Sequence, residues 1–129
     1  ILSSLVGSEM CIRDRNTTQT VVGLLGLNED QWSISFQSRI GPVKWLEPST
    51  MDKVEELVKR GVKKLAIVAP AFLADGLETL EELDIGIREH FLELGGEELI
   101  VIKCLNDNQD WVEGLSKLIT KKFSNPVAA

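Results

Sequence analysis

The sequence predicts an α/β fold with three layers, in which a parallel sheet carries helices on both faces. From Asn16 onward, helical and strand patterns alternate in the order α-β-α-β-α-β-α, which is typical of parallel sheets. The apolar run LAIVA, between Lys64 and Pro70, is typical of a strand buried on both faces. The 129 residues suffice for one domain. No apolar run approaches the roughly 18 residues of a membrane-spanning helix, which argues against integral membrane insertion.

The first two predicted elements are a helix and a strand. Asn16 can cap a helix that runs to about Leu25, where Gly26 ends it. Residues 32–36 alternate apolar and small polar side chains and are predicted to form a strand. A long loop punctuated by Gly and Pro follows at 37–48, and ordered loops of this length often carry function.

The next helix and strand have clear boundaries. Ser49 or Thr50 starts a helix that runs through Arg60 and stops at Gly61. Residues 64–69 then form the apolar strand described above.

The last predicted elements are two helices separated by a strand. A loop at 71–76 leads into a helix at 77–94, which ends at a Gly pair, and a strand follows at 99–103. Asp110 is the expected N-cap of a final helix that ends near residue 122. Ligands bind beyond the carboxyl ends of parallel strands. We therefore expect three segments to share one edge of the sheet: 36–48, 70–76 and 104–109.

The two ends of the chain do not follow this pattern. Residues 1–15 show no sustained periodicity, and we interpret them as a leader that is not native to the domain. The domain itself is expected over 16–122, and residues 123–129 are expected to fray.

The acidic side chains are concentrated in the second half of the chain. The net charge is −6, and residues 65–129 hold 12 of the 20 Asp and Glu residues but 5 of the 14 Lys and Arg residues. A surface of this sign repels phosphates, so nucleic acid is excluded as a partner. Cys11 and Cys104 belong to no Cys-x-x-Cys pair, which favours a reducing, cytosolic compartment.

The helix after Asp75 carries a row of acids. Glu78 and Glu82 are four residues apart, so α-helical geometry places them on one edge, and Asp75 extends the row into the loop. The row is either a solvated acidic face or, if enclosed, a group that shares protons or passes a divalent cation. At 100° per residue the opposite, apolar side consists of Leu77, Leu80, Leu83, Ile87, Phe91 and Leu94.

Other side chains leave alternatives open. Trp45 is either a partly buried plug in the 37–48 loop or a platform for a ligand. Arg39 is either a surface residue or a partner for a substrate carboxylate. His90 is the single histidine and has no ligand-forming neighbour in register, so a metal site there is not expected. No phosphate-binding glycine loop or nucleophile elbow occurs.

Three blocks of sequence together resemble one enzyme family. SFQSRIGPVKWLEP (35–48), VKKLAIVAPAFLADGLETLEELDI (62–85) and CLND (104–107) resemble the C-terminal part of ferrochelatase. This lyase inserts ferrous iron into protoporphyrin IX in the last step of haem biosynthesis. The resemblance covers residues 16–122 and implies the Rossmann-type half of a chelatase-like fold.

The resemblance also implies roles for individual residues. Glu78 matches the glutamate that lines the active site opposite a catalytic histidine, and Glu82 matches an acid on a proton or metal route. Asp75 and Glu78 are the implied metal-handling residues. The block that borders the porphyrin pocket supplies Gln37, Ser38, Arg39, Gly41, Pro42, Trp45 and Leu46.

The sequence departs from the family at several points. Gly86 stands where many members continue the acid row, and Gly76 stands where some have a histidine. No histidine segment of the H-S-x-P type precedes Asn16. The cysteines that hold an iron–sulfur cluster in some members are missing too, so no cluster is expected.

These departures lead to the hypothesis of a fragment. It is expected to be inactive alone, to need the N-terminal lobe of the same enzyme, and to take protoporphyrin IX and ferrous iron as substrates. The expected location is the bacterial cytoplasm, with peripheral contact to the inner membrane left open. The alternatives are a non-catalytic α/β module that binds a tetrapyrrole or a cation, and a receiver-like interaction domain.

Overall fold

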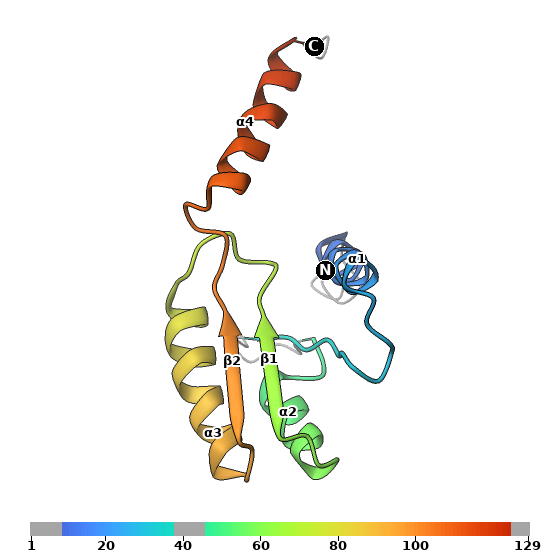
Figure 1. Ribbon diagram of the computed structural model, residues 1–129, viewed down its shortest axis with the longest axis vertical. Coiled ribbons are helices and arrows are strands. Elements are labelled where there is room, and N and C mark those ends of the chain that lie inside the picture. The colour runs from blue at the N-terminus through green and yellow to red at the C-terminus, as the bar shows by residue number, and fades with distance from the viewer. Residues whose placement is uncertain (1–8, 38–45, 125–129) are drawn as a thin grey trace, which may run out of the picture.

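The structure, a computed structural model, describes residues 9–37 and 46–124 (Figure 1). Helices and strands alternate through its central part, while the first and last helices extend away from it. No helix in these two ranges is long and apolar enough to cross a membrane. The elements are α1 (Glu9–Leu25), α2 (Thr50–Lys59), β1 (Lys64–Val68), the π-helix η1 (Glu78–Ile87), α3 (Arg88–Glu93), β2 (Glu98–Ile102) and α4 (Gln109–Ser124).

A small parallel sheet lies at the centre, which confirms the α/β class. β1 and β2 pair in parallel from Lys64 opposite Glu98 to Val68 opposite Ile102. The prediction of a strand at 32–36 is wrong, because this segment contributes only an isolated parallel bridge between Phe36 and Ser49. Its alternating pattern fits a strand, but in the described residues no neighbouring strand completes a ladder with it.

Helices α2, η1 and α3 pack together on one face of this sheet (Figure 1). The second face differs from the three-layer expectation because, in the described residues, its apolar side chains are exposed. Val68 is 56% exposed, and Ile100 and Ile102 are each 48% exposed. Within the described ranges the run at 64–69 is therefore covered on one face rather than two, with exposed and half-buried residues alternating along β1.

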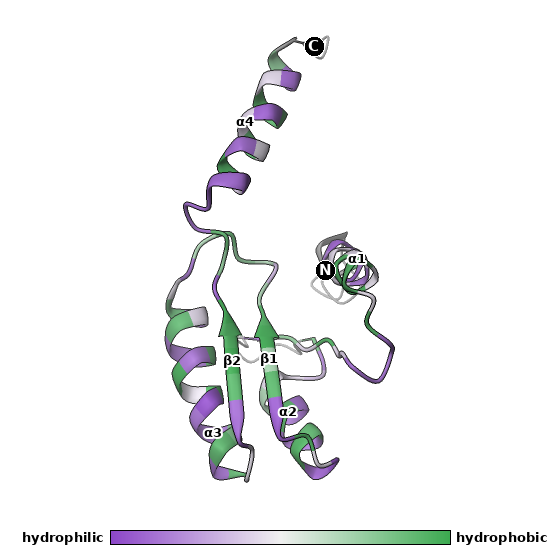
Figure 2. Ribbon diagram, viewed as in Figure 1, coloured by the Kyte–Doolittle hydropathy of each residue, from purple (hydrophilic) through white to green (hydrophobic). Residues whose placement is uncertain are grey.

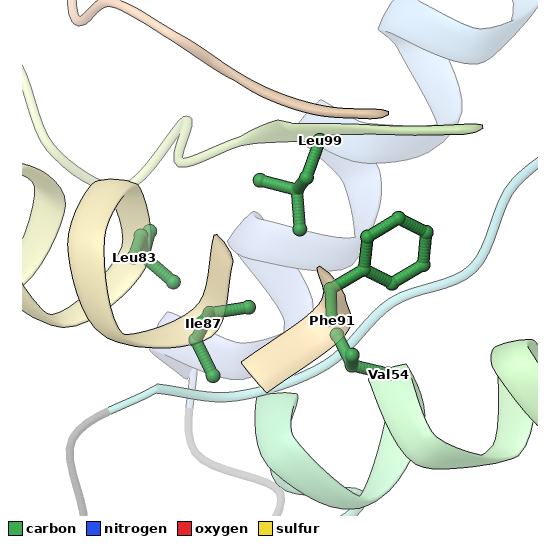
Figure 3. Packing of buried hydrophobic residues seen from close by; sticks show 5 residues of the cluster. All are labelled: Val54, Leu83, Ile87, Phe91 and Leu99. Atoms are coloured by element: carbon green, nitrogen blue, oxygen red, sulfur yellow. The ribbon is translucent and has the colours of Figure 1, made fainter. Parts of the chain in front are cut away.

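The core lies between the sheet and these helices (Figure 3). Phe91 is fully buried, and around it four more apolar side chains point inward from α2, η1 and β2. Burial of such side chains contributes about 1.5–3 kcal/mol each to folding. The buried set is Val54, Leu83, Ile87, Phe91 and Leu99, with Val58, Leu65, Ile67, Ala69 and Val101 packed against it.

The helix predicted at 77–94 consists of two parts, η1 and α3. In a π-helix each N–H bonds to the carbonyl five residues back, so residues four to five apart lie above one another. The buried positions accordingly step by four, through Thr79, Leu83, Ile87 and Phe91. The α-helical spacing placed Leu77, Leu80 and Leu94 on the apolar side, but they are 71%, 52% and 41% exposed.

The helix ends follow local rules with two corrections. The Ser49 side chain accepts a hydrogen bond from the Asp52 N–H and caps α2, as expected. The cap of α4 is Asn108 rather than Asp110, because the Asn108 Oδ1 accepts from the Trp111 N–H at 3.3 Å. Helix α1 begins at Glu9, so it extends across the boundary predicted at residue 16.

Substitution of Gly96 by alanine is expected to destabilise the fold by about 1–3 kcal/mol. A Cβ atom at this position would lie 2.2–2.5 Å from three carbons of the Phe91 ring, which is fully buried and cannot swing away. Urea unfolding followed by circular dichroism measures the loss. Gly23→Ala is the control, since a Cβ there meets no atom within 4 Å.

Candidate functional site

The predicted acids lie where β1 leads into the π-helix. Asp75 and Glu78 follow the carboxyl end of β1, and the segment after β2 lies beside them because Asp75 bonds to Cys104 and Asn106. The base of the 37–48 loop reaches the same region through a bond from Gln37 to Glu82. Hydrogen bonds thus confirm that segments 70–76 and 104–109 share one edge, while of the third segment the structure shows that Gln37 reaches Glu82 of η1.

Asp75 holds together the segments that follow β1 and β2, through a set of hydrogen bonds that we call the clamp. Its Oδ1 accepts from the Thr79 hydroxyl at 3.0 Å and from the Cys104 N–H at 3.2 Å. Its Oδ2 accepts from the Asn106 Nδ2 at 2.8 Å, and its own N–H donates to the Asn106 Oδ1 at 2.8 Å. Asn106 has a φ of 48°, a left-handed conformation that asparagine tolerates better than most residues. Both oxygens of Asp75 are therefore occupied within the protein.

These hydrogen bonds stabilise the charged form of Asp75. The bond from the Asn106 side chain, followed by that from the Cys104 N–H, lowers the pKa of Asp75 to about 2. Burial raises the pKa of the neighbouring Cys104 thiol, and Asp75 adds to this effect. Near neutral pH the pair is thus a carboxylate beside a protonated, unreactive thiol.

Acid is expected to release this clamp. The folded pKa of Asp75, about 2, lies below its ordinary value of 3.8, so its contribution to stability is complete above about pH 4 and is lost as the pH falls through about 2. We expect wild type to be more stable than Asp75→Asn above pH 4 and the gap to close towards pH 2. Urea unfolding of both proteins across this range measures the gap, and a gap independent of pH would contradict the assignment.

Glu78 lies at the first position of η1, beside Gly76. A Cβ at Gly76 would lie 3.2 Å from the Glu78 Oε2, so the glycine leaves room for the carboxylate to fold back over the loop. The turn below is fixed by Thr79, whose Oγ1 accepts from the Gly76 N–H at 3.0 Å. Glu78 is half-buried, and in the described ranges no hydrogen bond or ion pair engages its carboxylate. It can therefore exchange a proton or meet a cation without breaking the clamp.

Glu82 joins the acid row to the 37–48 loop. Gln37 donates from its Nε2 to the Glu82 Oε2 at 2.6 Å. The base of the loop is closed by backbone bonds, since the Phe36 N–H donates to the Pro48 carbonyl and the Thr50 N–H donates to the Phe36 carbonyl. Glu82 is thus an exposed residue that is hydrogen-bonded to the start of the loop.

The remaining predicted pocket residues divide into two groups. Leu46 is half-buried at the end of the loop. Five residues lie outside the described ranges: Ser38, Arg39, Gly41, Pro42 and Trp45. Among the residues that are described, no three His, Cys, Asp or Glu side chains form a group that could hold a metal ion. The metal roles of Asp75 and Glu78 stay predictions.

Thr79 and Asn106 are site residues that sequence reasoning did not single out. Thr79 is 1% exposed and bonds to both Asp75 and Gly76. Its four-residue spacing from Leu83, which places both on one helix face, was a usable signal. Asn106 occurs in the CLND block, yet nothing local predicts that it pairs with Asp75.

Comparison with known proteins identifies one family. The sequence model of the ferrochelatase family matches residues 12–123, so the match begins upstream of the boundary predicted at residue 16. The ferrochelatase of Stutzerimonas stutzeri is 48% identical over 111 residues, which cover 86% of this chain and 32% of that protein. That of Pseudomonas fluorescens is 51% identical over 102 residues, covering 79% and 30%. The chain spans about a third of the length of the curated relatives it matches.

Proposed function

The chain belongs to the ferrochelatase family, and we propose that it supplies part of an enzyme that inserts ferrous iron into protoporphyrin IX to form haem. The observation that carries this proposal is the hydrogen bond between Gln37 and Glu82. It joins the loop implied in porphyrin binding to the acid row implied in proton and metal transfer. A pocket for a macrocycle needs these two features side by side.

The three acids take different parts in this proposal. Insertion of a metal into a porphyrin requires two pyrrole nitrogens to lose their protons. Glu78, half-buried and without a bound donor in the described residues, relays a proton or passes the incoming iron. Glu82 continues the route next to the loop. Oxygen ligands of this kind suit a divalent cation in transit.

Asp75 contributes chiefly by holding the site together. Iron would have to displace the Thr79 hydroxyl or the Cys104 N–H to bind Oδ1, and it would compete with the Asn106 amide at Oδ2. If Asp75 bound iron, as the resemblance implies, it would lose hydrogen bonds that hold the site together. Binding of iron by Glu78 would break no such bond among the described residues. Asp75 instead fixes the start of the π-helix, and with it the position of Glu78.

The other components of the active site come from a separate lobe in this proposal. The chain spans about a third of its relatives, and the resemblance implies a catalytic histidine in an N-terminal lobe. The histidine takes pyrrole protons opposite Glu78, and the chain alone does not metallate porphyrin. Because the relatives are bacterial, we propose the cytoplasm as the location, with peripheral contact to the inner membrane left to experiment.

The proposed function is tested by measuring metal insertion after this chain is combined with the rest of a ferrochelatase. The chain is mixed with the remaining part of the Stutzerimonas stutzeri ferrochelatase, and absorbance of the metalloporphyrin is followed with protoporphyrin IX and ferrous iron under anaerobic conditions. We expect product with both components and none with either alone. Quenching of porphyrin fluorescence without turnover would instead favour a non-catalytic tetrapyrrole-binding module. Neither binding nor turnover would favour an interaction domain with a solvated acidic face.

A further inference from the structure

Among the apolar side chains that the described residues expose, two groups lie away from the core, on the second face of the sheet and along the last helix. The first, which we call the sheet patch, is formed by Ala66, Val68, Ile100 and Ile102 on the second face of the sheet. Ala66 is opposite Ile100 and Val68 is opposite Ile102, so the four side chains form a compact block. About half of the surface of Val68, Ile100 and Ile102 is exposed.

The second surface, the α4 stripe, runs along the last helix. Its members recur at the spacing of one helix face, and Figure 2 shows apolar and polar residues alternating along α4. They range from 39% exposure at Leu115 to 83% at Phe123. In the part of the chain that the structure describes, no helix or strand packs extensively against α4. A 16-residue helix on its own is marginal in water, so this face needs a partner. The stripe consists of Val112, Leu115, Leu118, Ile119 and Phe123.

We propose that the sheet patch and the α4 stripe together bind the remaining part of the ferrochelatase fold. This inference rests on the proposed function. Parallel sheets in α/β proteins are covered on both faces, and a sheet of two strands is rarely stable without further packing. The matched relatives are about three times as long as the matched segment, so ample chain exists outside it to cover both surfaces.

A second copy of this chain is a poorer occupant. Each copy carries a net charge of −6, so two copies repel each other before their apolar faces meet. A second copy would also bring only the same half-covered sheet. The lobe that contributes the rest of the active site must in any case lie against this chain for the reaction to occur, and these two surfaces give it an apolar place to bind.

The test measures affinity between this chain and the remaining part of the Stutzerimonas stutzeri ferrochelatase, by fluorescence anisotropy and size-exclusion chromatography. We expect a 1:1 complex, and we expect Ile102→Glu and Leu118→Glu each to weaken it at least tenfold. Leu92→Glu is the matched control, because Leu92 is 43% exposed on α3, away from both surfaces, and its variant should bind like wild type. Circular dichroism of each variant establishes that it is folded.

The outcomes separate this inference from the proposed function. Equal binding by wild type, Ile102→Glu and Leu118→Glu would overturn the docking surface, even if metal insertion occurs. A homodimer that persists when the other part is in excess, and that Ile102→Glu dissolves, would also overturn it in favour of a second copy. A complex that depends on both surfaces but inserts no iron would support the docking surface and count against the enzymatic role.

Discussion

Phe91→Ala is expected to lower the free energy of unfolding by about 3–5 kcal/mol, which is a large share of the roughly 5–15 kcal/mol that holds a typical domain together. Phe91 has no exposed surface and lies among core residues from α2, η1 and β2 (Figure 3). The buried core holds five hydrophobic residues in the described ranges, so few neighbours can relax into the cavity. Urea unfolding measured by circular dichroism should show a much lower midpoint or no folded baseline.

The neighbouring residue gives the control for this substitution. Leu92 follows Phe91 in α3 but is 43% exposed, and Leu92→Ala should change stability by about 0.5 kcal/mol or less. If Phe91→Ala were as mild as Leu92→Ala, the helices would not be held on the sheet through this ring. The assignment of the core to this face would then be wrong.

Local signals predicted the elements whose structure depends on their own residues. The Ser49 cap and the glycine stops after α1, α2 and α3 follow from side-chain capping and from positive φ at Gly26, Gly61 and Gly95. Both strands of the sheet were found because each is a short run of β-branched and aliphatic residues between turns. Their shared edge, with the acids beyond it, followed from the rule for parallel sheets.

Features that depend on distant partners were not predictable in the same way. Residues 32–36 have the pattern of a strand but, in the described part of the chain, no adjacent strand to bond with. The spacing of Leu77 and Leu80 suits an α-helix, but the chain forms a π-helix there and turns both outward. The bonds of Asp75 to Asn106 and Cys104 could not be predicted either, because they depend on the packing of β1 beside β2.

Glu78→Gln is expected to reduce the rate of metal insertion by the reassembled enzyme about 10²- to 10⁴-fold, the usual contribution of a positioned acid or base. Glutamine keeps the shape of the side chain, but it can neither accept and release a proton near neutral pH nor bind iron through a charged oxygen. The half-buried carboxylate beside Gly76 is the acid of the row that the clamp leaves available. We therefore expect kcat to fall while the KM for porphyrin changes little. Absorbance of the metalloporphyrin under single and multiple turnover measures both.

Glu81→Gln is the matched control, since Glu81 lies in the same π-helix and is exposed, but was not matched to any site residue. It removes the same charge, so a purely electrostatic effect of the acidic surface on iron would lower the rate of both variants alike. A loss confined to Glu78→Gln would mean that position matters and charge alone does not. Equal losses of rate in both variants would mean that the acid row is a solvated face that only attracts cations. The proton route would then have to lie in the other lobe. Because Asp75 holds the turn before Glu78, Glu78→Gln should unfold in urea at a midpoint close to that of wild type, which separates a chemical defect from a folding one.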